Sequence, residues 1–212
     1  MMESIEDLIE SLAGDAEPVR PARNPFLTWL KWTGMAAAYV FFALLISGHR
    51  NDLAERLHSP IFIAEMASLV FMVCSAALSA SLLSFPDLYQ RGRIVYLPLL
   101  SAACFAVVMM VAWRLDNPPS PLPVHSYQCT LSIALLSLLP MFSIFRSLRK
   151  NASTHAGWAG VNAVLYAFGT GAIWLRLEEA TNSIAHVLEW HYLPMLLVGI
   201  IGLWLGKKLL KW

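Results

Sequence analysis

Six stretches of the sequence are each long and apolar enough to cross a lipid bilayer as a helix, and this feature most constrains the fold. They cover about residues 28–47, 61–85, 94–113, 129–145, 157–175 and 191–206. A bilayer core of about 30 Å requires roughly 20 apolar residues in helical form. Because the apolar residues fall in blocks, without the alternation or stripe that buries one face, we predict an all-α integral membrane protein with a six-transmembrane-helix bundle.

Composition supports this class and argues against several others. Hydrophobic residues make up 58% of the 212 residues and charged residues only 14%, against about a quarter in a soluble domain. The net charge of +1 gives no reason to expect direct nucleic acid binding. Cys74, Cys104 and Cys129 have no paired spacing, so neither a disulfide framework nor a zinc finger is indicated. Nucleotide-binding and hydrolase motifs are missing, so we expect no enzyme activity and no cofactor.

The fourth stretch is the weakest of the six because it is short and contains Pro140. A proline in a helix interior removes a backbone hydrogen bond and produces a kink. Such a kink is tolerated inside a helix bundle, so we retain this stretch as a span.

Lys and Arg residues set the predicted orientation. With the N-terminus in the cytoplasm, 11 of the 15 cations lie on the cytoplasmic side and 4 outside. The inside cations are Arg20, Arg23, Lys31, Arg91, Arg93, Arg146, Arg149, Lys150, Lys207, Lys208 and Lys211, and the outside cations are Arg50, Arg56, Arg114 and Arg176. Because cytoplasmic loops carry the excess of Lys and Arg, we predict a multi-pass protein of the bacterial inner membrane with both termini in the cytoplasm.

The N-terminal segment combines acidic residues with an apolar stripe. Six of the 14 acidic residues occur within the first 17 positions. The apolar residues between them follow the i, i+3, i+4, i+7 spacing of one helical face: Ile5, Leu8, Ile9 and Leu12. Gly14 and Pro18 then end the pattern. We predict a short cytosolic amphipathic helix here.

This helix is too short to be stable alone in water, and an anionic inner leaflet would repel its carboxylates. One interpretation is a ligand for a partner with an apolar groove and a basic rim. The alternatives are a solvated tail or a helix that packs against the cytoplasmic loops of the same chain.

Several groups that bind soft metals are predicted on the outward side. Five of the six histidines belong to it: His49, His58, His125, His186 and His191. Cys129 begins the fourth span, and Glu178 and Glu179 lie in the fifth connection. Imidazole, thiolate and carboxylate together could form a metal or redox-responsive surface. However, a five-residue separation does not place His186 and His191 on one α-helical face, and a lone cysteine is more often an apolar filler. Whether this region binds a metal stays open.

Glu65 is the one carboxylate well inside a predicted span, about a turn into the second. An acidic group in hydrocarbon is costly and is usually paired, which makes it a functional candidate. We expect Arg56 or a nearby histidine as its partner, or alternatively an extended side chain that reaches the outer interface.

Several short motifs resemble the NrsF family of six-span bacterial membrane proteins. They occur in the following order along the chain: Asp7-Leu8-Ile9-x-x-Leu12, Pro18-Val19-Arg20-Pro21, Arg50-x-Asp52-Leu53, Phe62 with Glu65, Cys129, His186 with His191, and Gly206 to Trp212. Many members of the family carry a second outward cysteine before the last span, where this chain has Glu178 or Glu179.

The resemblance implies an anti-sigma factor for an extracytoplasmic-function sigma factor. Residues 1–27 would form the cytosolic sigma-binding segment, with partner contacts from Ile5, Asp7, Leu8, Ile9, Leu12, Pro18 and Val19. Residues 28–206 would form the transmembrane domain and 207–212 a basic cytosolic C-terminus. The candidates for sensing an outside signal are Asp52, Glu65, Cys129, His186 and His191. The rival interpretations are a small transporter or metal-handling protein and a structural subunit of a membrane complex.

Overall fold

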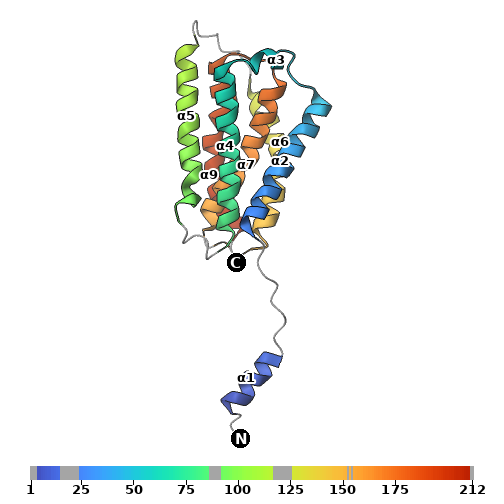
Figure 1. Cartoon of the computed structure of the whole chain (residues 1–212), viewed down its shortest axis with the longest axis vertical. Helices are drawn as coiled ribbons and strands as arrows, with labels where there is room; N and C mark the ends of the chain where they lie inside the picture. The colour runs from blue at the N-terminus through green and yellow to red at the C-terminus, as the bar shows by residue number, and fades with distance from the viewer. Residues whose placement is uncertain are drawn as a thin grey trace.

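The computed structural model describes residues 4–14, 24–85, 92–116, 126–151, 153 and 155–210, and the regular elements in these residues are all helical. Six segments are long and apolar enough to cross a membrane, and they stand side by side as a bundle (Figure 1). They are α2 (Pro25–Ser47), α4 (Pro60–Leu83), η2 with α5 (Ile94–Tyr96 and Leu97–Leu115), α6 (Tyr127–Leu148), α7 (Ala156–Glu178), and α8, η3 and α9 together (Ile184–His186, Val187–Tyr192 and Pro194–Leu209). The predicted six-helix membrane architecture is confirmed.

Two short helices lie outside these segments. α1 (Ile5–Gly14) belongs to the N-terminal segment, and α3 (Leu53–Arg56) lies between α2 and α4. The start of α2 and the end of α9 lie at one end of the bundle, whereas α3 lies at the opposite end (Figure 1). We call the end that carries α3 the far end. An even number of spans returns the chain to its starting side, as the sequence predicts.

α7 is the most buried of the six segments and lies at the centre of the bundle, where it packs against α9, α4, α6 and α2. Its contact with α9 depends on glycines. A Cβ atom on Gly160 would lie 2.7 Å from the backbone nitrogen of Gly206, and one on Gly202 would lie 2.9 Å from the Gly160 carbonyl oxygen. Gly202 and Gly206 form a GxxxG pattern, which allows helix backbones to approach closely in a membrane.

α4 uses small residues for the same purpose. The small residues expected to allow close packing are all buried: Ser75, Ala76, Ala77, Ser79, Ala80 and Ser81. The serine hydroxyls also tie α4 to its neighbours, since Ser79 donates to the Val95 carbonyl at 2.7 Å and Ser81 to the Pro25 carbonyl at 2.7 Å. The small side chains therefore allow close packing, and the serine hydroxyls also hydrogen-bond to the neighbouring segments.

Pro140 lies inside α6, which continues through it to Leu148. A proline has no N–H, so the carbonyl four residues earlier, that of Leu136, has no α-helical donor. The hydroxyl of Tyr39 in α2 donates to this oxygen at 3.0 Å. The hydrogen bond lost within α6 is thus replaced by one between helices.

The last segment begins earlier than predicted. Hydropathy places its start at residue 191, whereas the helical segment begins at Ile184. The residues before 191 include His186 and Glu189, which lower the local hydropathy. His186 is nevertheless buried, because it packs against polar side chains of other helices at the far end.

Candidate functional site

The N-terminal segment is described through α1. Ser4 and Asp7 cap its start reciprocally: the Asp7 backbone N–H donates to Ser4 Oγ at 3.2 Å, and the Ser4 N–H donates to Asp7 Oδ2 at 3.3 Å. This capping box satisfies two donors that a helix start leaves unpaired. Asp7 therefore has a structural role in addition to the partner contact predicted for it.

The apolar residues of α1 are open to contact. Ile5, Ile9 and Leu12 have exposed fractions of 75%, 60% and 63%, and the acidic residues Glu6 and Glu10 are exposed as well. Leu8 lies within α1. Pro18 and Val19, which were also predicted to contact a partner, lie outside the described residues.

The second region of interest is a polar network at the far end, centred on Glu65. This carboxylate is only 1% exposed. Arg176 of α7 donates to it twice, from Nε to Oε1 at 2.7 Å and from Nη2 to Oε2 at 3.0 Å, and the Tyr192 hydroxyl donates to Oε1 at 2.6 Å. The expectation of Arg56 or a histidine as its partner is wrong, and so is the alternative of a side chain that reaches the interface. Glu65 is instead held inside the bundle by a paired guanidinium and a phenol, which offset the cost of burying its charge.

Phe62, one turn before Glu65, contacts two guanidinium groups. The Cζ atoms of Arg176 and Arg50 are 5.2 and 5.6 Å from the centre of its ring. Both distances are within the range of a cation–π contact. Phe62 therefore joins the Glu65 network to the loop that follows α2.

Asp52 lies in that loop and pairs with Arg50. Arg50 Nε donates to Asp52 Oδ1 at 2.6 Å, and Arg50 Nη2 donates both to Asp52 Oδ2 at 2.9 Å and to Asn182 Oδ1 at 2.6 Å. Arg56 Nε adds a longer bond of 3.3 Å to Asp52. The hydrogen bond from Arg50 holds the pKa of Asp52 well below its usual range. Asp52 thus orients an arginine that bridges to the connection between α7 and α8.

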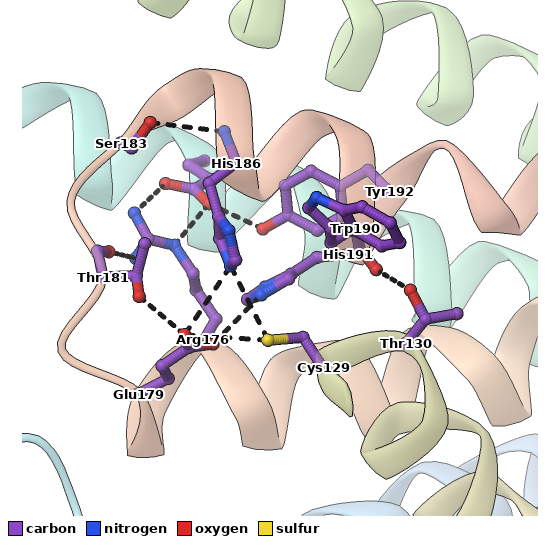
Figure 2. A network of polar contacts seen from close by, with 11 residues as sticks. Cys129, Thr130, Arg176, Glu179, Thr181, Ser183, His186, Trp190, His191 and Tyr192 are labelled. Carbon is purple, nitrogen blue, oxygen red and sulfur yellow. Dashed lines mark hydrogen bonds and ion pairs between the residues drawn. The ribbon is translucent and has the colours of Figure 1, made fainter. Parts of the chain in front are cut away.

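Four other candidates converge beside this network. The ligand-type atoms of Cys129, Glu179, His186 and His191 all lie within 4.8 Å of one another (Figure 2). The Cys129 thiol is 3.7 Å from Glu179 Oε1 and 3.6 Å from His186 Nε2. The two histidines approach the same carboxylate, with His186 Nε2 at 3.6 Å from Oε1 and His191 Nε2 at 3.1 Å from Oε2. We call these four residues the Cys-Glu-His-His cluster.

The expectation that His186 and His191 would lie on different faces is wrong, because the helix changes type between them. Residues Val187–Tyr192 form a π-helix, in which hydrogen bonds span five residues. The backbone N–H of Leu193 accordingly donates to the Leu188 carbonyl at 2.8 Å. The two imidazole rings therefore lie next to one another in an edge-to-face arrangement, with their centres 5.3 Å apart.

Pro194 gives a local reason for this irregular turn. It has no N–H, so the Trp190 carbonyl four residues earlier has no α-helical donor. Thr130 of α6 donates its hydroxyl to that carbonyl, as Figure 2 shows. A side chain next to Cys129 thus fixes the π-helical turn against α6.

Glu179 links the cluster to the Glu65 network through Thr181. Its Oε1 atom accepts a hydrogen bond from Thr181 Oγ1 at 2.6 Å, and Arg176 Nη1 donates to the Thr181 carbonyl at 2.8 Å. Burial raises the pKa of Glu179, but the contact with His191, the hydrogen bond from Thr181 and the nearby histidine charges outweigh it and lower the pKa to about 2. Glu179 is therefore a carboxylate across the physiological range.

Of the predicted sensing residues, Cys129, His186 and His191 come together in the cluster, whereas Glu65 belongs to the adjoining network and Asp52 to the loop beyond it. His49 and His58 are exposed, and His125 lies outside the described residues. Sequence reasoning named Glu178 and Glu179 together as possible carboxylate ligands without deciding between them, and it gave no role to Tyr192. The position of Arg176 at the end of a span could have marked it as a candidate for a buried ion pair. Its partner Glu65 could not be predicted, because only the fold brings the two residues together.

Comparison with known proteins identifies a family over most of the chain. A family model described as NrsF, "Negative regulator of sigma F", matches residues 12–212. The chain belongs to the NrsF family. The anti-sigma-F factor NrsF of Caulobacter vibrioides (strain NA1000 / CB15N) is 28% identical over 216 residues, which cover 98% of this chain and 99% of that protein. The probable anti-sigma-F factor NrsF of Azospira oryzae (strain ATCC BAA-33 / DSM 13638 / PS) is 28% identical over 217 residues, with the same coverage. No solved structure matches the chain.

The predicted resemblance to the NrsF family is confirmed, and the family description and the names of both relatives support the predicted anti-sigma function. The family match includes all six membrane-capable segments but begins at residue 12. Most of the apolar stripe of α1 therefore precedes the part of the chain that the NrsF model matches.

Proposed function

We propose that this chain is a membrane-anchored anti-sigma factor of the bacterial inner membrane. It sequesters an extracytoplasmic-function sigma factor in the cytosol through residues 1–27 and releases it in response to an extracytoplasmic signal. The observation that carries this proposal is the NrsF family match over residues 12–212, which includes every membrane-capable segment. Its role is regulatory, without catalysis.

α1 has the chemistry that this partner would require. A sigma factor presents basic surfaces to DNA, and the exposed carboxylates of Glu6 and Glu10 complement such a surface. Ile5, Ile9 and Leu12 are exposed apolar anchors for a groove. Charge complementarity speeds encounter and sets register, while a few buried apolar side chains supply most of the affinity.

The bundle offers a continuous physical connection between the far end and the segment that carries α1. Arg176 and the start of the Glu179 connection lie at one end of α7. Near the middle of α7, the Tyr166 hydroxyl donates to the Trp32 carbonyl of α2 at 2.7 Å. Since α2 follows the N-terminal segment, a shift of α7 caused by a signal at the far end would change the position of the sigma-binding residues.

The proposal is tested by capture of the sigma factor on the full-length chain in detergent. The variant Ile5→Asp/Leu8→Asp/Ile9→Asp/Leu12→Asp places charges on the apolar stripe and should abolish capture. Ser11→Asp adds a charge to α1 away from the stripe and serves as the matched control, which should retain capture. If the stripe variant captures the sigma factor as well as the control does, the helix-in-groove interaction is wrong.

The proposed orientation has a separate test. A reporter active only in the cytoplasm should work when fused after Trp212, and a reporter active only outside should work when inserted beside His58. The opposite pattern would place the sigma-binding segment outside the cell and would exclude the proposed function.

A further inference from the structure

We propose that the Cys-Glu-His-His cluster is a binding site for a single divalent transition-metal ion of the Zn²⁺ type. Cys129 Sγ, a carboxylate oxygen of Glu179 and one nitrogen each from His186 and His191 are the ligands. This proposal concerns metal binding alone, and its test does not depend on whether the chain captures a sigma factor.

The first support is geometric. A tetrahedral ion with metal–ligand distances of about 2.0–2.3 Å holds its ligand atoms about 3.3–3.8 Å apart. The Glu179 oxygens lie 3.1 Å from His191 Nε2, 3.6 Å from His186 Nε2 and 3.7 Å from Cys129 Sγ. Cys129 Sγ lies 3.6 Å from His186 Nε2. No separation in the cluster exceeds 4.8 Å, so closure around an ion requires only about 1 Å of side-chain movement.

The second support is the number of buried polar atoms without a partner. The His191 side chain is 1% exposed, yet neither of its ring nitrogens makes a hydrogen bond. Glu179 Oε2, which lies 3.1 Å from His191 Nε2, has no hydrogen-bond partner either. Buried polar atoms are nearly always paired, and a cation bound among these four residues would supply a partner for His191 and for Glu179 Oε2.

Charge and ligand type narrow the identity of the ion. One thiolate, one carboxylate and two neutral imidazoles balance a dication and leave a site without net charge, which limits the cost of burial. On binding, the Cys129 thiol loses its proton to water and its sulfur forms the metal bond. Mixed nitrogen, sulfur and oxygen ligands in a tetrahedral arrangement suit Zn²⁺ or Co²⁺ and not Mg²⁺ or Ca²⁺.

The surroundings also hold the ligands in place as metal sites require. Thr181 donates to the Glu179 oxygen at 2.6 Å, and the Ser183 hydroxyl accepts from the His186 backbone N–H at 3.3 Å. Such outer contacts orient ligands before the ion arrives. Because Arg176 bonds to both Glu65 and the Thr181 carbonyl, an ion that moves Glu179 would also act on the pairing between α4 and α7.

The test uses the full-length chain in detergent, stripped with a chelator and titrated with Co²⁺. We expect one ion per chain, a sulfur-to-cobalt absorption band, and displacement by Zn²⁺ but not by Mg²⁺. Cys129→Ser should lose the band, and His191→Ala should weaken binding about 100-fold, given that even outer contacts are worth 10- to 100-fold. His58→Ala, an exposed histidine at the same end of the bundle, is the matched control and should leave binding unchanged.

A measurement on the unchanged chain avoids any dependence on variant folding. Zn²⁺ should protect Cys129 from alkylation by a membrane-permeant maleimide, whereas Mg²⁺ at the same concentration should not. Equal alkylation of Cys129 with and without Zn²⁺, or Co²⁺ binding that persists in Cys129→Ser/His191→Ala, would overturn the proposal. The cluster would then be only an ion pair between histidine and Glu179.

Discussion

Glu65 of α4 and Arg176 of α7 form a bidentate ion pair inside the helix bundle, with nitrogen–oxygen distances of 2.7 and 3.0 Å. Both side chains are almost completely buried. Tyr192 adds a third donor from the π-helix, so three segments of the bundle meet at one carboxylate. A pair of this kind is costly to bury and damaging to break, which fixes how these segments can be arranged.

Removal of Glu65 should therefore destabilise the bundle strongly. Glu65→Ala leaves the Arg176 guanidinium buried without its counter-ion, which costs about 3–5 kcal/mol. We expect this loss in the free energy of unfolding measured in detergent. Glu55→Ala changes an exposed glutamate of α3 and should alter stability by no more than about 0.5 kcal/mol. Similar values for the two variants would mean that the ion pair does not hold α4 and α7 together.

The bond from Tyr39 to the Leu136 carbonyl should matter only while residue 140 is proline. Tyr39→Phe leaves that partly buried carbonyl without its side-chain donor, at a cost of about 1 kcal/mol. In a Pro140→Ala background the new N–H supplies the missing donor, so the same Tyr39→Phe change should cost close to zero. A double-mutant cycle from thermal unfolding measures this coupling, and equal costs in the two backgrounds would contradict it.

Gly206 should not tolerate a side chain, whereas Gly199 on the same helix should. A Cβ on Gly206 would collide with the Ala156 carbonyl oxygen of α7, but nothing lies within 4 Å of one on Gly199. Gly206→Leu should therefore destabilise the chain by about 1–3 kcal/mol or more through overpacking. Gly199→Leu is the control, and a melting temperature lowered equally in both would show that α7 and α9 are not closely packed there.

The contribution of Asp52 to stability should disappear in acid. Arg50 lowers the pKa of Asp52 in the folded chain, so the unfolded chain takes up a proton at higher pH than the folded one. The stabilisation is complete above the ordinary aspartate pKa of about 3.9 and decreases as the pH falls below it. The difference in melting temperature between the natural chain and Asp52→Asn should stay constant from pH 8 to pH 5 and shrink below about pH 4. A difference that does not change with pH would show that the carboxylate charge contributes nothing.

Charge on α1 should govern how fast the proposed partner binds. Glu6→Gln/Glu10→Gln keeps the apolar stripe but removes two exposed carboxylates, so the association rate should fall about tenfold at low salt. The dissociation rate should change little, and added salt should reduce the difference between the two proteins. Surface plasmon resonance with the full-length chain measures both rates. If the variant instead changed only the dissociation rate, these carboxylates would make direct buried contacts with the partner.

Much of the fold could be predicted because the bilayer imposes it through length and composition. The six apolar stretches gave the six segments, and small residues in α4 indicated close packing that the structure confirms. The start of the last segment was wrong because His186 made the sequence look polar where the chain is already helical. A hydropathy pattern does not record whether a polar side chain will find a partner inside the bundle.

Sequence alone determined that this chain is a six-span helical protein and that it resembles the NrsF family, since both depend on the order of residues along the chain. Only the tertiary structure decided that Glu65 pairs with Arg176, 111 positions away, and that Cys129 and Glu179 meet the two histidines. It also showed that a π-helix brings His186 and His191 together. The physical reason is that helix type and helix packing set side-chain direction, and both depend on contacts between segments far apart in the sequence.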